Sequence, residues 1–264
     1  MKKFLVIGNP IEHSLSPILH NYWININGIN AVYEKKKIDE SELEKVVLDI
    51  RQKKIDGINV TVPFKKTIIP FLDKLSIEAE STQSVNMLYL KDNKVIGHNT
   101  DIIGFQTSIE KFKYNVSNKE ILIIGAGGVV PSIIFSLNKM NASKIKIINR
   151  TKNKAENLKK LFRNIEIIEW GEVPNFDMVI NATSVGLKKD DNINLDFSSK
   201  SKNSFFYDVI YNPRETNFLK TGKKMGSITL NGKFMFIYQA LSAFNIWHKI
   251  EPSVDEDVIK LLDQ

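Results

Sequence analysis

The sequence predicts an α/β protein with two domains, and three observations support this expectation. Short apolar segments that suit strands alternate with segments that suit helices, which is typical of parallel sheets covered by helices on both faces. This alternation starts twice, once near the N-terminus and again at residue 120. The 264 residues also suffice for two domains of ordinary size.

The first run of elements lies before residue 100. Ser16 and Pro17 are typical of a helix start, because serine caps free amides and proline suits the first helical position. Asp92 and Asn93, between two short apolar segments, indicate a hairpin turn. We expect strands at residues 4–8, 31–37 and 57–61, helices at 16–27 and 41–52, and a hairpin at 87–90 and 94–97.

The second run begins with a buried strand that leads into a glycine-rich turn. We expect strands at residues 120–124, 144–149, 177–181 and 205–208, and helices after residue 128 and at 151–162. A long helix at 234–249 comes last and is separated in sequence from the first run. No low-complexity tract or flexible linker divides the two runs.

Composition excludes several classes of site. Hydrophobic residues make up 42% and charged residues 25% of the chain, the balance of a soluble globular protein. The chain has no cysteine, which excludes disulfides, thiolate zinc sites and cysteine nucleophiles. Its four histidines form no tight metal-binding pair, so we expect no metal site.

Charge and targeting signals narrow the expected partners. The net charge of +7 comes from lysines spread along the chain, which favours a solvated surface over nucleic-acid binding. The apolar run at the N-terminus is too short for a signal peptide. No segment approaches the roughly 20 apolar residues of a membrane span. We therefore expect a cytoplasmic protein with no nucleic-acid or membrane partner.

Gly125, Ala126, Gly127 and Gly128 lie between a predicted strand and a predicted helix, the context of a dinucleotide-binding turn. Glycines permit a tight turn and close backbone approach, and the helix N-terminus presents amides and partial positive charge to a pyrophosphate. Val130 stands where the fingerprint has its third small residue, which could push the helix away from the strand. The alternative is a glycine-rich turn that holds no ligand.

The end of the next predicted strand favours NADP over NAD. NAD sites usually carry an acid there for the ribose 2′-hydroxyl. This chain has Asn149 and Arg150, and an arginine can pair with a 2′-phosphate and stack on the adenine. Lys152 and Lys154 add positive charge nearby. The alternative is that Thr151 caps a helix and the lysines are solvated.

Four polar clusters at strand ends and in loops suggest a catalytic site in the first half. They are residues 9–16, 59–65, Asn86 and residues 99–101. Taken singly, Ser16 and Asp101 could be helix caps, Lys65 a solvated lysine and Asn86 a turn residue. Taken together, they fit hydride transfer from a polyhydroxylated substrate. Such a reaction needs a proton acceptor on the alcohol oxygen, and a lysine oriented by a carboxylate can supply one.

Other dehydrogenase types fit less well. The zinc-dependent type lacks ligands, and the short-chain type needs Tyr-x-x-x-Lys on one helix. Tyr33 and Lys37 have this spacing, but they lie in a predicted strand, where four residues span roughly 13 Å. They also precede the nucleotide-binding turn, so we reject this match.

These segments, in this order, resemble those of the shikimate dehydrogenases, which reduce 3-dehydroshikimate to shikimate with NADPH. The resemblance spans nearly the whole chain, and several segments are long enough to be specific. The matching segments are residues 8–17, 59–65, 85–86, 97–101, 125–128, 149–151, 181–186, 208–213 and 231–232, and Gln239.

The resemblance implies a role for individual residues. Lys65 would be the catalytic acid/base and Asp101 its partner and a further substrate contact. The other implied substrate contacts are Ser14, Ser16, Thr61, Asn86, Tyr211 and Gln239. The implied cofactor-binding residues are Gly125, Ala126, Gly127, Gly128, Val129, Asn149, Arg150, Thr151, Lys154, Val209 and Gly232, the last two near the nicotinamide.

The resemblance also implies the layout and the biological role. A substrate domain at residues 1–100 would be completed by 235–264, and a Rossmann-type NADP-binding domain would occupy 101–234. The active site would be the cleft between the two domains. The reaction would belong to the shikimate pathway of aromatic amino acid biosynthesis, and the protein would be a monomer or homodimer.

The chain departs from the family pattern at three places. Met87 replaces a usual threonine, Lys233 and Phe234 replace a residue and a glycine, and Val130-Pro131 replaces a common Ala-Arg. Two alternatives to a strict shikimate dehydrogenase stay open. One is a paralogue that also oxidises quinate, with broader substrate or cofactor use, and the other is a non-catalytic NADP-binding regulator.

Overall fold

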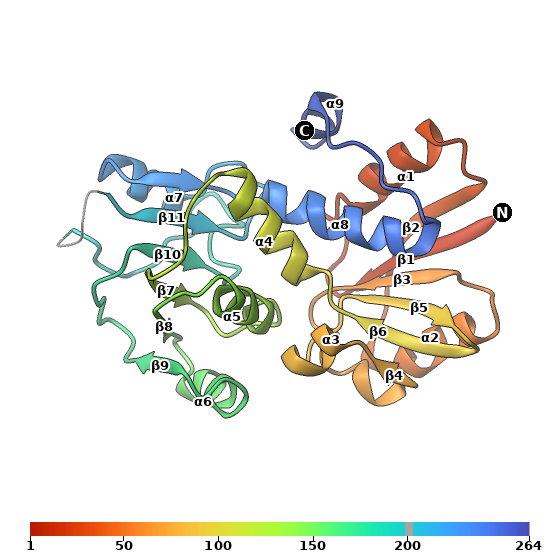
Figure 1. The fold of residues 1–264 in the computed structure, drawn as a ribbon, viewed down its shortest axis with the longest axis horizontal. Helices are drawn as coiled ribbons and strands as arrows, with labels where there is room; N and C mark the ends of the chain where they lie inside the picture. The colour runs from red at the N-terminus through yellow and green to blue at the C-terminus, as the bar shows by residue number, and fades with distance from the viewer. Residues whose placement is uncertain (199–202, 264) are drawn as a thin grey trace. The chain divides into compact units, whose positions relative to one another are not determined.

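Each of the two runs of strands forms a sheet of its own (Figure 1). The computed structural model describes residues 1–198 and 203–263. Its compact unit 1 comprises Met1–Gly104 and the chain from Ile237 onward, and its unit 2 comprises Phe105–Phe236. The expected domain boundaries at residues 100 and 235 lie within a few residues of these divisions. The two-domain α/β fold class is confirmed.

The sheet of unit 1 has six strands in the order β2-β1-β3-β5-β6-β4. The strands are β1 (Lys2–Gly8), β2 (Ala31–Lys37), β3 (Gly57–Val60), β4 (Lys74–Leu75), β5 (Met87–Lys91) and β6 (Lys94–His98). Strand β1 is parallel to β2 and β3, but β5 is antiparallel to β3 and β6. The sheet is therefore mixed rather than purely parallel. The expected hairpin accounts for this, since Asp92 and Asn93 adopt positive φ angles of 50° and 57°.

The helices of unit 1 bury the apolar stripes that the sequence predicts. They are α1 (Ser16–Ile26), α2 (Leu43–Arg51), α3 (Ile77–Thr82) and α9 (Glu256–Leu261), with most of α8 (Lys233–His248) and the start of α4 (Asp101–Lys111). Two short 3-10 turns, Glu40–Glu42 and Ile69–Phe71, complete the unit. In α2, Leu43, Val46, Val47 and Ile50 are at most 1% exposed. Their spacing places them on one helical face, which explains why this segment folds as a helix against the sheet.

Unit 2 has a parallel sheet in the order β12-β11-β10-β7-β8-β9. The strands are β7 (Glu120–Ile124), β8 (Lys144–Ile148), β9 (Ile165–Ile168), β10 (Met178–Asn181), β11 (Phe205–Asp208) and β12 (Ile228–Leu230). Numbered along the chain from β7, this order is 3-2-1-4-5-6 read from the β9 edge, which is that of a dinucleotide-binding Rossmann fold. The helices are α5 (Val130–Lys139), α6 (Lys152–Leu161) and α7 (Asn217–Lys224), with most of α4 and the start of α8. The prediction of a Rossmann-type second domain is confirmed.

Several elements differ from the sequence-based expectation. Helix α1 begins at Ser16, with Leu15 at the cap position, so Ser16 lies inside the first turn and is not the cap. Six short elements were not expected from the sequence, namely β4, β9, β12, α3, α7 and α9. No helix within residues 1–198 and 203–263 is long and apolar enough to cross a membrane.

A cluster of aromatic rings lies beneath α1 in unit 1. His20 is 1% exposed and stacks on Tyr33, with ring centroids 4.2 Å apart. Neither of its ring nitrogens has a hydrogen-bond partner among the described residues. Burial, with a smaller contribution from His248, lowers the pKa of His20 from the usual 6.5 to about 3. Folding therefore requires the neutral imidazole.

This burial predicts a loss of stability in mild acid. Between pH 6.5 and 3 the unfolded chain binds a proton that the folded chain excludes, so stability falls as pH falls through this window. Because of His20, we expect the free energy of unfolding to be about 2 kcal/mol lower at pH 5 than at pH 7. Urea titrations at both pH values should show this difference in the native chain and lose it in His20→Phe. His13→Gln, at an exposed position, is the control; an unchanged pH dependence in His20→Phe would contradict the account.

Candidate active site

Lys65 and Asp101 form a largely buried ion pair in unit 1. Lys65 lies in the turn that follows β3, and Asp101 is the first residue of α4. The distance from Lys65 Nζ to Asp101 Oδ2 is 2.6 Å, and the two side chains are 12% and 7% exposed. The sequence predicted that these residues act together, and the fold brings them into direct contact across 36 residues of chain.

Further hydrogen bonds hold the Asp101 carboxylate. Asn86 donates from Nδ2 to Asp101 Oδ1 at 2.9 Å, and the Asp101 backbone amide donates to Asn99 Oδ1 at 3.1 Å. The Thr100 amide donates to Asn86 Oδ1 at 2.8 Å, which fixes the orientation of the Asn86 amide. Gln239 Oε1 lies 3.5 Å from Asn86 Nδ2. Four predicted site residues, Lys65, Asn86, Asp101 and Gln239, are therefore linked in one network.

The backbone of the sheet sets the position of this network. The Asn86 amide donates to His98 and its carbonyl accepts from Val60, so Asn86 lies at the end of the β3-β5-β6 ladder. The Lys65 carbonyl accepts from the Val85 amide at 2.8 Å. The turn that carries Lys65 is thus bonded to the residue next to Asn86.

A second layer of buried polar groups lies behind Asn86. Asn59 donates from Nδ2 to the Asn86 carbonyl at 3.1 Å, and the Tyr33 hydroxyl donates to Asn59 Oδ1 at 2.6 Å. A side-chain hydrogen bond joins Ser16 to Tyr33, while burial raises the pKa of Tyr33 well above its usual value. Roles for Thr100, Asn59 and Tyr33 were not predicted from the sequence. Asn59 is the first residue of the polar cluster 59–65, so a role in the site could have been predicted for it. No feature of the sequence predicts that Tyr33 is its hydrogen-bond partner.

The remaining substrate contacts expected in the first half lie on or next to two joined loops. The loop after β1 carries Ser14, Ser16 begins α1 directly after this loop, and Thr61 directly follows β3. The Asn9 amide donates to the Val62 carbonyl at 3.0 Å, which joins the two loops. Ser14 and Thr61 are half-buried and Ser16 is buried.

In unit 2, the glycine turn between β7 and α5 fits an anion. Gly125 has a φ of +114°, and a Cβ there would lie 2.8 Å from the Ala182 carbonyl oxygen, so the fold requires glycine. Gly127 is exposed, and a Cβ there would lie 3.8 Å from the same oxygen, an ordinary contact distance. The surrounding atoms of the protein therefore leave room for a side chain at this position. Helix α5 begins after Val129 without a side-chain cap. The turn and the helix N-terminus therefore suit a pyrophosphate.

The family departures near the turn and the hairpin are accommodated inside the fold. Val130 is 0% exposed within the core of unit 2, and Pro131 occupies the first turn of α5. Met87 is 0% exposed in β5.

The end of β8 carries the residues expected at a 2′-phosphate. Asn149 donates from Nδ2 to the Thr151 carbonyl at 2.7 Å, and Thr151 precedes α6 without capping it through its side chain. Arg150 is exposed and takes part in no ion pair within residues 1–198 and 203–263, and the same holds for Lys154. Lys152 instead pairs with Glu169, which follows β9. The free positive charge is therefore that of Arg150 and Lys154.

The segment after β11 carries two of the predicted site residues, Val209 and Tyr211, and Gly232 after β12 contacts it. Val209 directly follows β11, and Tyr211 stacks on Phe236 with ring centroids 4.5 Å apart. A Cβ on Gly232 would lie 2.1 Å from the Val209 carbonyl oxygen, so only glycine fits at this contact.

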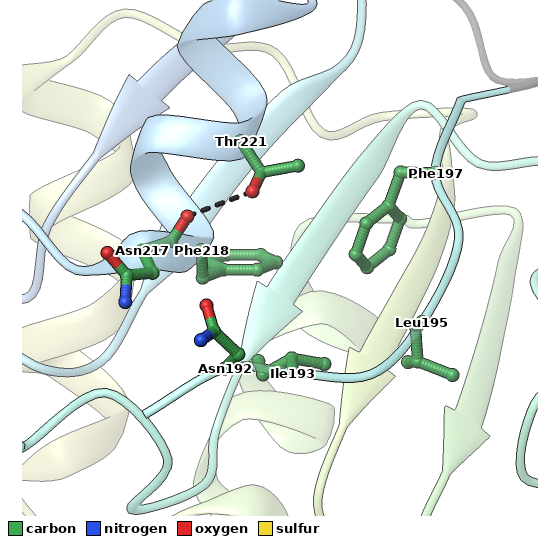
Figure 2. A pocket seen from close by; sticks show the side chains of 7 residues that line it. All are labelled: Asn192, Ile193, Leu195, Phe197, Asn217, Phe218 and Thr221. Carbon is green, nitrogen blue, oxygen red and sulfur yellow. Dashed lines mark hydrogen bonds between the residues drawn. The ribbon is translucent and has the colours of Figure 1, made fainter. Parts of the chain in front are cut away.

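A small pocket elsewhere in unit 2 holds none of the predicted site residues (Figure 2). The rings of Phe197 and Phe218 line it beside Asn192, and Thr221 donates to the Asn217 carbonyl at its edge. Its volume of about 40 Å³ suits a water molecule rather than a substrate. Within the described part of the chain, no group of three or more His, Asp or Glu residues could hold a metal ion.

Comparisons with known proteins identify the family of this chain. The family model "Shikimate dehydrogenase substrate binding domain" matches residues 6–88, and "Shikimate / quinate 5-dehydrogenase" matches residues 107–222. The chain belongs to the shikimate dehydrogenase family. A shikimate dehydrogenase (NADP(+)) of Pelagibacter ubique is 63% identical over 262 residues, covering 99% of both chains. The same enzyme of Caldicellulosiruptor saccharolyticus is 38% identical, covering 95% of this chain and 93% of its own.

Solved structures of shikimate dehydrogenases share the fold over the whole chain. The Aquifex aeolicus structure has a TM-score of 0.90 at 36% identity and covers 100% of this chain and 98% of its own. The Thermus thermophilus structure, in complex with NADP(H) and shikimate, has a TM-score of 0.90 at 26% identity with the same coverage. The resemblance drawn from the sequence motifs is thereby confirmed.

Proposed function

We propose that this chain interconverts 3-dehydroshikimate and shikimate with NADP(H), and that Lys65 and Asp101 transfer the proton. One observation supports this proposal most strongly. In this member of the shikimate dehydrogenase family, Lys65 and Asp101 lie 2.6 Å apart and both side chains are largely buried. A lysine there can bind, orient and exchange a proton with a substrate oxygen. Both groups come from segments that suit the family's motifs.

The charges of Lys65 and Asp101 suggest how the proton is transferred. NADP+, when bound, would supply the acceptor for the hydride of the alcohol carbon of shikimate. The hydroxyl proton leaves in the same reaction, and we assign the neutral amine of Lys65 as its acceptor, so that this step produces the ammonium that pairs with Asp101. In the reverse direction the Lys65 ammonium, held by Asp101, donates that proton to the carbonyl oxygen. Asn86 holds the Asp101 carboxylate throughout, and Asn99 holds the Asp101 backbone amide.

The polar side chains around the pair suit a polyhydroxylated acid. Hydroxyl and amide groups can each donate and accept, so they can match several hydroxyls of a substrate. We assign this role to Ser14, Ser16, Thr61, Asn86, Tyr211 and Gln239, with Asp101 as a further contact. On this assignment the substrate domain is residues 1–100 completed by 235–264.

The residues of the Rossmann domain, 101–234, suit NADP. The exposed glycine turn and the uncapped start of α5 would hold the pyrophosphate, and Arg150 with Lys154 would hold the 2′-phosphate. Val209 and Gly232 would border the nicotinamide. The other residues that we assign to the cofactor are Gly125, Ala126, Gly127, Gly128, Val129, Asn149 and Thr151.

An NADPH-forming assay with shikimate tests the function and the proton-transfer pair together. We expect turnover by the native chain and a loss of at least about a hundredfold in kcat for Lys65→Ala, because the proton acceptor is removed. NADP binding, measured by protein fluorescence, should survive. Lys66→Ala is the matched control, since Lys66 is exposed in the same turn, and it should keep native turnover.

Two outcomes of this assay would contradict the proposal. Near-native turnover by Lys65→Ala would reject Lys65 as the acid/base. Binding of NADP by the native chain without shikimate-dependent NADPH formation would favour a non-catalytic regulator. Equal or faster rates with quinate and NAD would instead identify a quinate-oxidising paralogue.

Cofactor preference gives a separate prediction for Arg150. Arg150→Ala should weaken NADP binding by about tenfold or more, because a guanidinium contact to the 2′-phosphate is lost, and should change NAD binding little. Titration of both nucleotides against both proteins measures this difference. Lys152→Ala is the control, since Lys152 is paired with Glu169. Equal losses for NADP and NAD would show that Arg150 does not recognise the 2′-phosphate.

A further inference from the structure

Asp208, the last residue of β11, is a buried carboxylate that the proposed mechanism does not use. It is 0% exposed. Its Oδ1 accepts from Asn181 Nδ2 at 3.1 Å and from the Ile210 amide at 3.0 Å, and its Oδ2 accepts from Thr216 Oγ1 at 2.6 Å. Three donors from three different segments of unit 2 therefore converge on one side chain.

No cation offsets this charge. Within residues 1–198 and 203–263, Asp208 forms no ion pair, and burial raises its pKa to about 6 although its hydrogen bonds act to lower it. A buried carboxylate without a cation is unfavourable, and its retention depends on the donors that surround it. A carboxylate accepts on both oxygens, whereas an asparagine would turn its amide group toward a donor. The site is therefore built for the carboxylate.

The Asp208 carboxylate fixes the segment that follows it. The Ile210 amide donates to Asp208, and the Ile210 carbonyl accepts from the Gly232 amide at 3.1 Å. The Val209 amide donates to the Asn181 carbonyl at 3.0 Å. Gly232 packs directly on the Val209 carbonyl. The backbone of residues 209 and 210 is thus held on both sides.

The same carboxylate joins two further loops to this segment. Thr216 donates its hydroxyl to Asp208 and also caps α7, because its Oγ1 accepts from the Leu219 amide at 3.3 Å. Asn181 binds Asp208 and the Val185 carbonyl with the same amide group. Movement of the Asp208 side chain would therefore be transmitted to the loops after β10 and β11.

We propose that Asp208 is a positioning residue for hydride transfer, because its carboxylate holds the Ile210 amide and so fixes the backbone between Val209 and Tyr211. This inference rests on the proposed function, which assigns Val209 to the nicotinamide and Tyr211 to the substrate. The end of β11, which carries Asp208, is separated by β10 from the end of β7, where the pyrophosphate is assigned, and by β10 and β7 from the end of β8, where the 2′-phosphate is assigned. Loss of the carboxylate should therefore impair turnover while leaving most of the NADP affinity.

The test uses three variants with small changes in shape. Asp208→Asn keeps the size of the side chain and places an amide where an acceptor is needed. Thr216→Val removes the hydroxyl donor, and Thr216→Ser keeps it. Asp177→Asn is the matched control, since Asp177 also accepts a backbone amide, that of Glu120, but at the opposite end of β10.

Four quantities are measured on each full-length protein: kcat and KM with shikimate, the Kd for NADP, and amide hydrogen exchange over residues 209–213 without ligands, in which Pro213 has no amide hydrogen. We expect Asp208→Asn and Thr216→Val to lose about tenfold to a hundredfold in kcat, because small displacements at a reacting centre have large effects on rate. Their NADP Kd should change less than about threefold, and exchange at residues 209–213 should be faster. Thr216→Ser and Asp177→Asn should stay within about twofold of the native kcat.

The inference is overturned if Asp208→Asn and Thr216→Val keep native kcat, or if Thr216→Ser is as slow as Thr216→Val. It is also overturned if NADP affinity falls in parallel with kcat, or if exchange at residues 209–213 is unchanged. If Asp208→Asn does not fold, the Thr216 pair decides the question by the same measures. An inactive native chain would reject the proposed function, whereas the exchange rates would still test the structural role of Asp208.

Discussion

The buried ion pair between Lys65 and Asp101 is the interaction on which the candidate active site depends. Removing two charges from water is unfavourable unless they are paired and their remaining hydrogen-bonding capacity is satisfied. Asn86 donates to the Asp101 carboxylate, and Asn99 accepts from the Asp101 backbone amide and in turn donates to Thr82 Oγ1 and the Ser84 carbonyl. The fold therefore holds the pair in place before any substrate arrives, which is the electrostatic preorganisation that catalysis needs.

Unit 2 uses the same principle at the carboxyl edge of its parallel sheet. Asp208 is buried and satisfied by three donors, and it holds a loop rather than a reacting group. The glycines serve the opposite purpose, since Gly125 and Gly232 let backbone segments touch where a side chain would collide. Gly127 is different, because no contact within the chain requires it. The Rossmann domain thus combines rigid loop anchors with an open turn suited to an anion.

Much of this fold could be predicted from local patterns. The strand–glycine turn–helix at residues 120–139 and the hairpin at Asp92-Asn93 follow from short-range signals, and both are present. Strand β4 could not be predicted, because its two residues pair with β6 only through tertiary structure. The ion pair of Lys152 with Glu169 was missed for a related reason, since β9 was not expected. The contact of Lys65 with Asp101 was anticipated from motifs, but the Tyr33-Asn59 layer behind it depends on the register of β1 with its neighbours.

A double-mutant cycle on Lys65→Met and Asp101→Asn tests the central claim most directly. If the two residues act as one proton-transfer unit, the double variant should have a kcat close to that of Lys65→Met alone, with a coupling energy of at least about 1.5 kcal/mol. Circular dichroism and the NADP Kd of each variant establish that the fold is retained. Losses in kcat that simply multiply in the double variant would show that Lys65 and Asp101 act independently and would contradict the account.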